Sequence, residues 1–198
     1  MQTFDLLVIG SGPAGQRAAI QGAKLGKRVG VIERREVVGG VCVNTGTIPS
    51  KTCREAVLHL SGYYYQNVYG VNYRVKEKIN MADLAFRVQH VIKTEIDVIQ
   101  AQLSRNNIEL ITGIATFTDP HTVRFQNSRG GQAYSSEAII IATPGVSHVE
   151  IGVRALKQNL AVLLEKPIAP SASAAVPLLA AARRSTGFVM PGPACARR

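Results

Sequence analysis

Residues 4–15 read FDLLVIGSGPAG, and this stretch decides the fold. Its apolar first half predicts a buried strand over 4–9, and the small residues that follow predict a helix over 14–26. Residues 28–33 read RVGVIE and predict a second strand. Strand, glycine-rich turn, helix and strand together form a βαβ unit, so the chain begins with a parallel sheet.

The turn has the spacing G-x-G-x-x-G that dinucleotide sites use. Gly10 permits the tight turn, Gly12 lets the backbone approach a pyrophosphate, and Gly15 lets the helix pack close to the strand. The phosphates then lie at the helix N-terminus, where free N–H groups and the dipole favour anions. Glu33 ends the second strand, where a carboxylate accepts ribose hydroxyls and repels a 2′-phosphate, which disfavours NADP. The alternative is a glycine turn used only for packing.

The rest of the chain alternates apolar and helical patterns. After a glycine-rich loop from Gly39 to Pro49, we expect a helix that starts near Ser50 and another over 82–105. Further along we expect a strand over 108–117, a hairpin of 121–126 and 132–137, a strand over 138–142, a helix over 147–159, a strand over 161–165, a helix over 172–185 and a strand over 187–190. Right-handed crossovers then give an α/β fold, a doubly wound parallel Rossmann-type sheet ordered 3-2-1-4-5-6, with an inserted helical pair and a small β-hairpin.

Composition excludes several classes of protein. Residues 1–100 carry 13 basic and 8 acidic side chains and residues 101–198 carry 10 and 5, so the net charge of +10 is spread evenly at +5 and +5. No basic block stands out, and we expect no nucleic-acid partner. No apolar run approaches the ~20 residues of a membrane-spanning helix, and no basic leader opens the chain, so we expect a cytoplasmic protein without a membrane partner. The cysteines (Cys42, Cys53 and Cys195) predict neither a disulfide framework nor a metal site.

Residues 39–51 read GGVCVNTGTIPSK and indicate which dinucleotide is bound. The segment resembles the redox site of the pyridine nucleotide-disulfide oxidoreductases, the family of dihydrolipoamide dehydrogenase and glutathione reductase. In that family two cysteines lie beside the flavin ring. This sequence keeps the first as Cys42 but has Thr47 at the second position. A threonine cannot form a disulfide or a thiolate pair with flavin, so dithiol–disulfide chemistry is excluded.

The Cys-to-Thr pattern is similar to the soluble transhydrogenase branch of that family. The resemblance implies a flavoprotein oxidoreductase that passes a hydride from NADPH to NAD through FAD, with Si specificity and with NAD(P)H as a diffusible co-substrate. It implies that Lys51 lies near the flavin N5 and Cys42 beside the ring. The alternatives are a solvated lysine and a small buried cysteine without chemistry. The implied FAD contacts are Gly10, Ser11, Gly12, Pro13, Ala14, Gly15, Glu33, Arg34, Gly40, Val41, Cys42, Gly46, Thr47, Lys51, Gly113, Ala115, Ala142 and Thr143.

The same resemblance implies the domain organisation. Residues 1–143 would form the FAD-binding domain, and residues 144–198 an atypical βα tail that extends the sheet, with roughly the last eight residues disordered. The family's second glycine-rich βαβ unit and its dimerisation domain have no counterpart in the sequence. We therefore expect a truncated or chimeric member of a family that forms homodimers.

Residues 139–192 resemble a different family, the glucose–fructose oxidoreductase and inositol dehydrogenase type. The residues that carry this resemblance are Ala142-Thr143-Pro144, His148, Glu150-Ile151, Ala155-Leu156 and Glu165-Lys166-Pro167. They imply the later half of an NAD(P) Rossmann domain, with Lys166 close to the nicotinamide and the substrate. Two alternatives therefore stay open: an NAD-dependent dehydrogenase module that uses Lys166, and a non-catalytic remnant.

Overall fold

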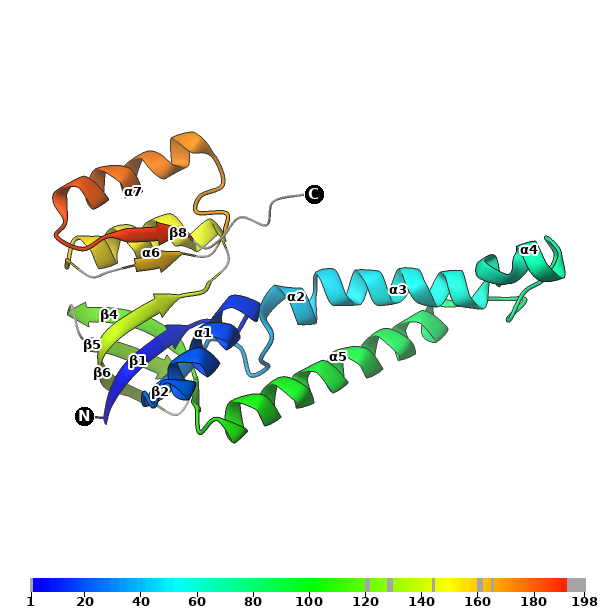
Figure 1. Ribbon diagram of the computed structural model, residues 1–198, viewed down its shortest axis with the longest axis horizontal. Coiled ribbons are helices and arrows are strands. Elements are labelled where there is room, and N and C mark those ends of the chain that lie inside the picture. The colour runs from blue at the N-terminus through cyan, green and yellow to red at the C-terminus, as the bar shows by residue number, and fades with distance from the viewer. Residues whose placement is uncertain are drawn as a thin grey trace. The chain divides into compact units, whose positions relative to one another are not determined.

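The computed structural model describes residues 2–119, 122–127, 130–143, 145–159, 162–164 and 166–191. Its contacts divide the chain into two compact units, Met1–Val38 with Gln100–Arg198, and Gly39–Ile99. In chain order the strands are β1 (Gln2–Ile9), β2 (Val29–Glu33), β3 (Glu109–Thr112), β4 (Ile114–Asp119), β5 (Thr122–Asn127), β6 (Gly130–Ile141), β7 (Val162–Leu164) and β8 (Val189–Pro191) (Figure 1). The helices are α1 (Pro13–Lys24), α2 (Gly40–Asn44), α3 (Thr47–Leu60), the 3₁₀ turn η1 (Tyr63–Tyr65), α4 (Gln66–Tyr69), α5 (Met81–Arg105), α6 (Gly145–Leu156) and α7 (Ala172–Arg184).

The parallel strands of the first unit lie in the order β3-β2-β1-β6-β7-β8. If these six parallel strands are numbered along the chain, with the antiparallel β4 and β5 left out, the order is 3-2-1-4-5-6, which confirms the predicted topology. The central strand is β1, where Val8 pairs with Val31 on one side and with Ile140 on the other. Strands that have a neighbour on each side and are covered on both faces are rich in apolar residues, and that explains the apolar run over 6–9.

An antiparallel meander of β4, β5 and β6 extends the same sheet. The prediction of one strand over 108–117 is wrong, because Gly113 separates β3 from β4. A Cβ at Gly113 would lie 2.7 Å from Phe125 Cδ2 and 2.9 Å from Gln126 O, so only glycine allows the chain to turn so close to β5.

Strand β6 replaces two predicted strands. The hairpin arm over 132–137 and the strand over 138–142 are one continuous element. Its first part pairs antiparallel with β5, as in Val123↔Tyr134, and its second part pairs parallel with β1, as in Val8↔Ile140. One long strand therefore joins the antiparallel meander to the parallel strands within a single sheet.

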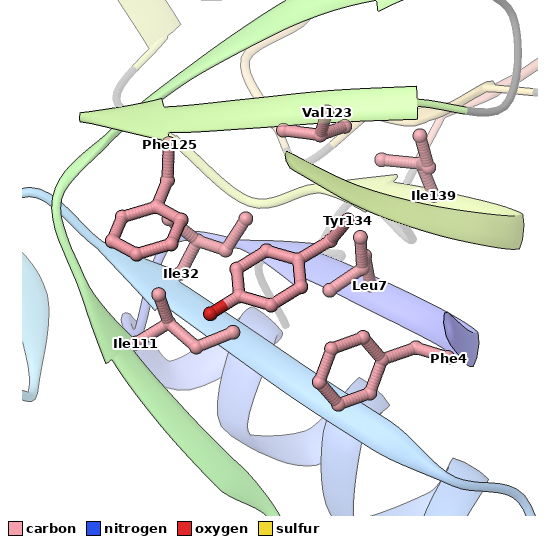
Figure 2. Close-up of a cluster of buried hydrophobic side chains, with 8 residues drawn as sticks. All are labelled: Phe4, Leu7, Ile32, Ile111, Val123, Phe125, Tyr134 and Ile139. Carbon is pink, nitrogen blue, oxygen red and sulfur yellow. The ribbon is translucent and has the colours of Figure 1, made fainter. Parts of the chain in front are cut away.

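A buried cluster holds the meander against the parallel strands (Figure 2). Its members are Phe4, Leu7, Ile32, Ile111, Val123, Phe125, Tyr134 and Ile139. Tyr134 stacks on Phe125 with ring centroids 5.1 Å apart and meets Phe4 edge-on at 5.5 Å. Aromatic pairs of this geometry add to the stability gained from burial, so Tyr134 helps to hold β6 against both β1 and β5, with which it pairs.

The C-terminal elements form a second cluster around α6, β7 and α7. It contains Ile141, Ala155, Leu156, Val162, Leu164 and Leu178. Gly152 lets α6 approach α7, because a Cβ there would lie 2.7 Å from Leu178 Cδ1. The predicted disorder at the end of the chain concerns residues that, from 192 on, lie outside the described part.

The second unit contains the inserted helices α2 to α4 and most of α5, and this agrees with the predicted helical pair. The expected loop from Gly39 to Pro49 is partly wrong, because α2 occupies residues 40–44 and α3 begins at Thr47 rather than near Ser50. Pro49 lies in the first turn of α3, where its missing N–H removes no helical hydrogen bond. No helix among the described residues is long and apolar enough to span a membrane.

Candidate functional site

The glycine loop joins the carboxyl ends of three neighbouring parallel strands. The amide of Gly10 donates to Ile32 O at 2.8 Å, and the amide of Ala142 donates to Ile9 O at 2.8 Å. Gly10 has a φ of +107°, and a Cβ there would overlap the carbonyl oxygen of Ala142. Only glycine satisfies both constraints, so the tight turn predicted for Gly10 is present.

Gly15 and Gly12 face different surroundings on the same turn. A Cβ at Gly15 would overlap the carbonyl oxygen of Gly10 and would lie 3.3 Å from Ala142 Cβ, so α1 packs directly on the loop. A Cβ at Gly12 would have no atom of the described residues within 4 Å. The space beside Gly12 is therefore open to a ligand.

Helix α1 presents a free N-terminus to this open space. Its N-cap is Gly12, which has no side chain to bond the first amides, and Pro13 and Ala14 follow in the first turn. The first turn contains no acidic residue. Amides without a helical partner and the positive end of the helix dipole favour an anion such as a pyrophosphate.

Glu33 is a buried carboxylate beside the loop, and only 8% of it is exposed. Its Oε2 accepts from the Ser11 amide at 3.0 Å and from Ser11 Oγ at 2.6 Å. Its Oε1 accepts from the Arg35 amide at 3.1 Å. The amide of Gly113 donates to the backbone oxygen of Glu33 at 2.8 Å. The carboxylate and the glycine loop therefore form one connected site.

Other predicted contacts of the first unit lie near the same strand ends. Thr143 follows β6, and its Oγ1 accepts from Ser147 Oγ at 2.9 Å. Arg34 directly follows Glu33 and is exposed, and Ala115 lies on β4 and packs against the first cluster. In a parallel sheet the carboxyl ends of the strands are where ligands bind, so this edge is the candidate dinucleotide site.

The remaining predicted contacts form a separate set in the second unit. Gly40, Val41 and Cys42 begin α2, and Gly46 and Thr47 begin α3, with Lys51 in its second turn. A Cβ at Gly46 would lie 2.9 Å from Val41 O, so glycine lets α2 and α3 join closely. Cys42 and Cys53 are half-buried free thiols, whereas Thr47 and Lys51 are exposed.

His148 connects the ends of β6 and β7. It is fully buried, its Nε2 contacts the carbonyl oxygen of Thr143, and its Nδ1 lies 2.9 Å from Pro167 O. Lys166 precedes Pro167 and is exposed at this edge. The sequence did not predict these contacts of His148. It also did not predict that Gln16 Nε2 donates to Ser11 O at 2.7 Å, because neither interaction has a sequence signature.

The described ranges contain no group of three or more His, Cys, Asp or Glu side chains that could hold a metal ion.

Comparison with known proteins places the chain in a family. The family model described as pyridine nucleotide-disulphide oxidoreductase matches residues 4–165. The chain is 54% identical over 145 residues to soluble pyridine nucleotide transhydrogenases of Mycobacterium bovis (strain BCG / Pasteur 1173P2) and Mycobacterium tuberculosis (strain ATCC 25177 / H37Ra), covering 72% of this chain and 31% of each relative. It is 36% identical over 141 residues to that of Colwellia psychrerythraea, covering 71% of this chain and 30% of the relative.

A solved structure has the same fold. It is the Cu(II) complex of the HOCl-induced flavoprotein disulfide reductase RclA from Escherichia coli, with a TM-score of 0.59 and 20% identity over 98% of this chain and 50% of that chain. The present chain spans about a third of the length of the curated relatives above. The resemblance of residues 139–192 to the glucose–fructose oxidoreductase type stays a prediction. Because the family model matches most of the sequence, the chain belongs to the pyridine nucleotide-disulphide oxidoreductase family.

Proposed function

We propose that this chain is the FAD-binding part of an oxidoreductase similar to the Si-specific NAD(P)+ transhydrogenases. The observation that carries the proposal is the glycine loop, open at Gly12 and joined to the buried carboxylate of Glu33. FAD, when bound, supplies a ring that takes a hydride from NADPH and returns it to NAD+. Both nicotinamide nucleotides would be diffusible co-substrates.

The first unit would hold the adenosine and pyrophosphate half of FAD. The open side of Gly12 lets phosphate oxygens approach the N-terminus of α1, where unpartnered amides donate. Glu33 accepts from the adenosine ribose, and its negative charge repels a 2′-phosphate. Gly113 and Ala115 would border the adenine. These residues fit FAD and disfavour NADP in the same place.

The residues that the family resemblance implies beside the flavin ring lie within the second unit. We propose contacts from Gly40, Val41, Cys42 and Gly46, and we place Lys51 near N5, where a cation favours the reduced ring. Thr47 supplies no sulfur, so no dithiol relay intervenes between nicotinamide and flavin. A hydride passed between a bound flavin and a nicotinamide would need no side chain as a general acid or base.

A visible absorption spectrum tests the cofactor proposal. The purified, desalted protein should show flavin bands, or acquire them when titrated with FAD. Gly12→Val places a side chain in the open space, so the variant should fold but stay colourless. A wild-type protein that stays colourless with added FAD would overturn the flavoprotein proposal and favour the non-catalytic remnant or an NAD-only module. A yellow protein should then reduce an NAD analogue with NADPH.

Domain limits and location belong to the same proposal. Residues 1–143 would be the FAD-binding domain and residues 144–198 a βα extension of its sheet. The proposed location is the cytoplasm. Cell fractionation would test it, and limited proteolysis would test whether a stable fragment ends near Thr143.

The two contacts of the His148 side chain favour a second candidate function. They hold Pro167, next to Lys166, against the end of β6 at the ligand edge of the sheet. A dehydrogenase module that uses Lys166 beside a nicotinamide would need this proximity. In that case NADH fluorescence should rise on binding and Lys166→Met should abolish the rise, with no flavin present.

A further inference from the structure

The side chain of Ser11 is directed at Glu33 rather than at the ligand space. Ser11 is fully buried, and both its amide and its hydroxyl donate to one oxygen of the carboxylate, Oε2. The 2.6 Å distance from Oγ to Oε2 is typical of a charge-assisted hydrogen bond. Gln16 Nε2 in turn donates to Ser11 O at 2.7 Å, and this hydrogen bond fixes the backbone of Ser11.

The two oxygens of Glu33 therefore differ in what they can still accept. A carboxylate oxygen has two acceptor positions, and the two bonds from Ser11 fill both positions of Oε2. Oε1 accepts one bond, from the Arg35 amide at 3.1 Å. Among the described residues no second donor to Oε1 is found. One acceptor position of Glu33 thus remains for a ligand, and it is on Oε1.

We propose that Ser11 is a positioning residue that fills Oε2 of Glu33 and thereby makes Oε1 the single oxygen that accepts from the ribose of a bound adenosine. This inference rests on the proposed dinucleotide site. It changes the expectation from the sequence, since Ser11 acts through Glu33 and the ribose is held by one carboxylate oxygen rather than by both.

Hydrogen exchange in the ligand-free protein tests the first half of the proposal. Ser11→Ala removes the hydroxyl and leaves only the amide of residue 11 bonded to Oε2, so the carboxylate rotates more easily and the Arg35 amide should exchange about tenfold faster. The Gly113 amide is the matched control, because it donates to the backbone oxygen of Glu33 and does not depend on the carboxylate. Unchanged exchange at Arg35, or equal acceleration at both amides, would overturn the proposal.

Ligand binding tests the second half. Ser11→Ala should weaken FAD about tenfold, the scale of one charge-assisted hydrogen bond, and Ser11→Cys, which donates weakly, should give an intermediate loss. FAD made with 2′,3′-dideoxyadenosine should bind the wild type and Ser11→Ala alike, because it presents no ribose hydroxyl to Oε1. Equal weakening of both ligands would show a merely structural role and would overturn the proposal.

Failure of the cofactor proposal is distinguishable from failure of this one. If the wild type binds no FAD, ADP-ribose and its dideoxy counterpart replace the two flavin ligands. The expected pattern is the same, since both contain the adenosine ribose. If ADP-ribose does not bind either, ribose recognition by Oε1 is overturned. A urea unfolding curve for each variant establishes that it is folded.

Discussion

Replacing Gly15 with alanine tests whether α1 is pressed against the glycine loop as closely as the structure indicates. The added Cβ would overlap the carbonyl oxygen of Gly10 and would lie 3.1 Å from Gly10 C. Backbone atoms cannot turn away as a side chain does. The loop is also fixed from behind, because the Gly10 amide donates to Ile32 O at 2.8 Å. Relief therefore requires α1 to move off the sheet.

The magnitude follows from two opposing contributions. Overpacking costs about 1–3 kcal/mol, and the rigid backbone contact places Gly15→Ala at the upper end of that range. Alanine is favoured over glycine within a helix by about 1 kcal/mol, which offsets part of the loss. The free energy of unfolding should therefore fall by about 2 kcal/mol.

Gly22→Ala in the same helix is the matched control. Its Cβ would lie 2.7 Å from Leu6 Cδ2 and 3.3 Å from Val29 Cγ2, which are ends of side chains. Leu6 can adjust, so a cost of about 1 kcal/mol is balanced by the same gain in helix propensity. We expect Gly22→Ala to unfold at nearly the same urea concentration as the wild type.

Urea unfolding followed by far-ultraviolet circular dichroism measures both variants. With a slope of about 2 kcal/mol per molar urea, the midpoint of Gly15→Ala should fall by about 1 M. A Gly15→Ala variant as stable as Gly22→Ala would refute the close contact between α1 and the loop, and with it the inferred path of the backbone past a pyrophosphate.

Three further predictions address other parts of the chain. Leu164→Ala, at a fully buried position of the second cluster, should lower the free energy of unfolding by about 2–5 kcal/mol, whereas no change in the urea midpoint would mean that β7 does not pack against α6 and α7. The 2.6 Å hydrogen bond from Lys76 lowers the pKa of Asp83, so the stability that ionised Asp83 contributes is present above its unfolded pKa and is lost as the pH falls below about 4. The variant Lys76→Met should therefore lose less stability than the wild type over that range. Equal losses in pH-dependent unfolding would contradict this. With FAD bound, NADH should not reduce lipoamide, because Thr47 provides no second sulfur beside Cys42, and disulfide reduction in a thiol assay would show the opposite.

The βαβ unit was predictable because local signals agree there. An apolar run marks β1, a glycine spacing marks the turn, and Glu33 ends β2, and all three signals are consistent with one βαβ unit. The strand order followed from chain direction and short connections, which leave few alternatives for a parallel sheet.

The meander was harder to predict, because its breaks depend on contacts distant in sequence. Gly113 separates β3 from β4 because Phe125 and Gln126 lie against it, and a glycine inside an apolar run does not show that by itself. The length of β6 depends on which partner each half meets, so the sequence offered no reason to join its two segments.

The candidate site was predictable in position but not in detail. The spacing of Gly10 and Gly15 and the place of Glu33 locate the edge of the sheet where a dinucleotide would bind. The sequence did not show that Ser11 donates twice to one oxygen of Glu33, because serine at a variable position of the motif carries no signal of its own. Whether a carboxylate is free or occupied is decided by geometry.

The two resemblances in the sequence meet in β6, and the pairing of this strand explains why the join gives a continuous sheet. Ile141 pairs with Ile9 of β1 on one side and with Leu164 of β7 on the other. Both families have an apolar parallel strand at this place, so β6 can pair with β1 on one side and with β7 on the other. The loop after β6 then serves both halves, since Ala142 borders Gly10 while Thr143 contacts His148. A cofactor at the glycine loop and a reaction at Lys166 would therefore share one edge of the sheet, and the choice between the two proposed functions depends on whether FAD or a nicotinamide dinucleotide binds there.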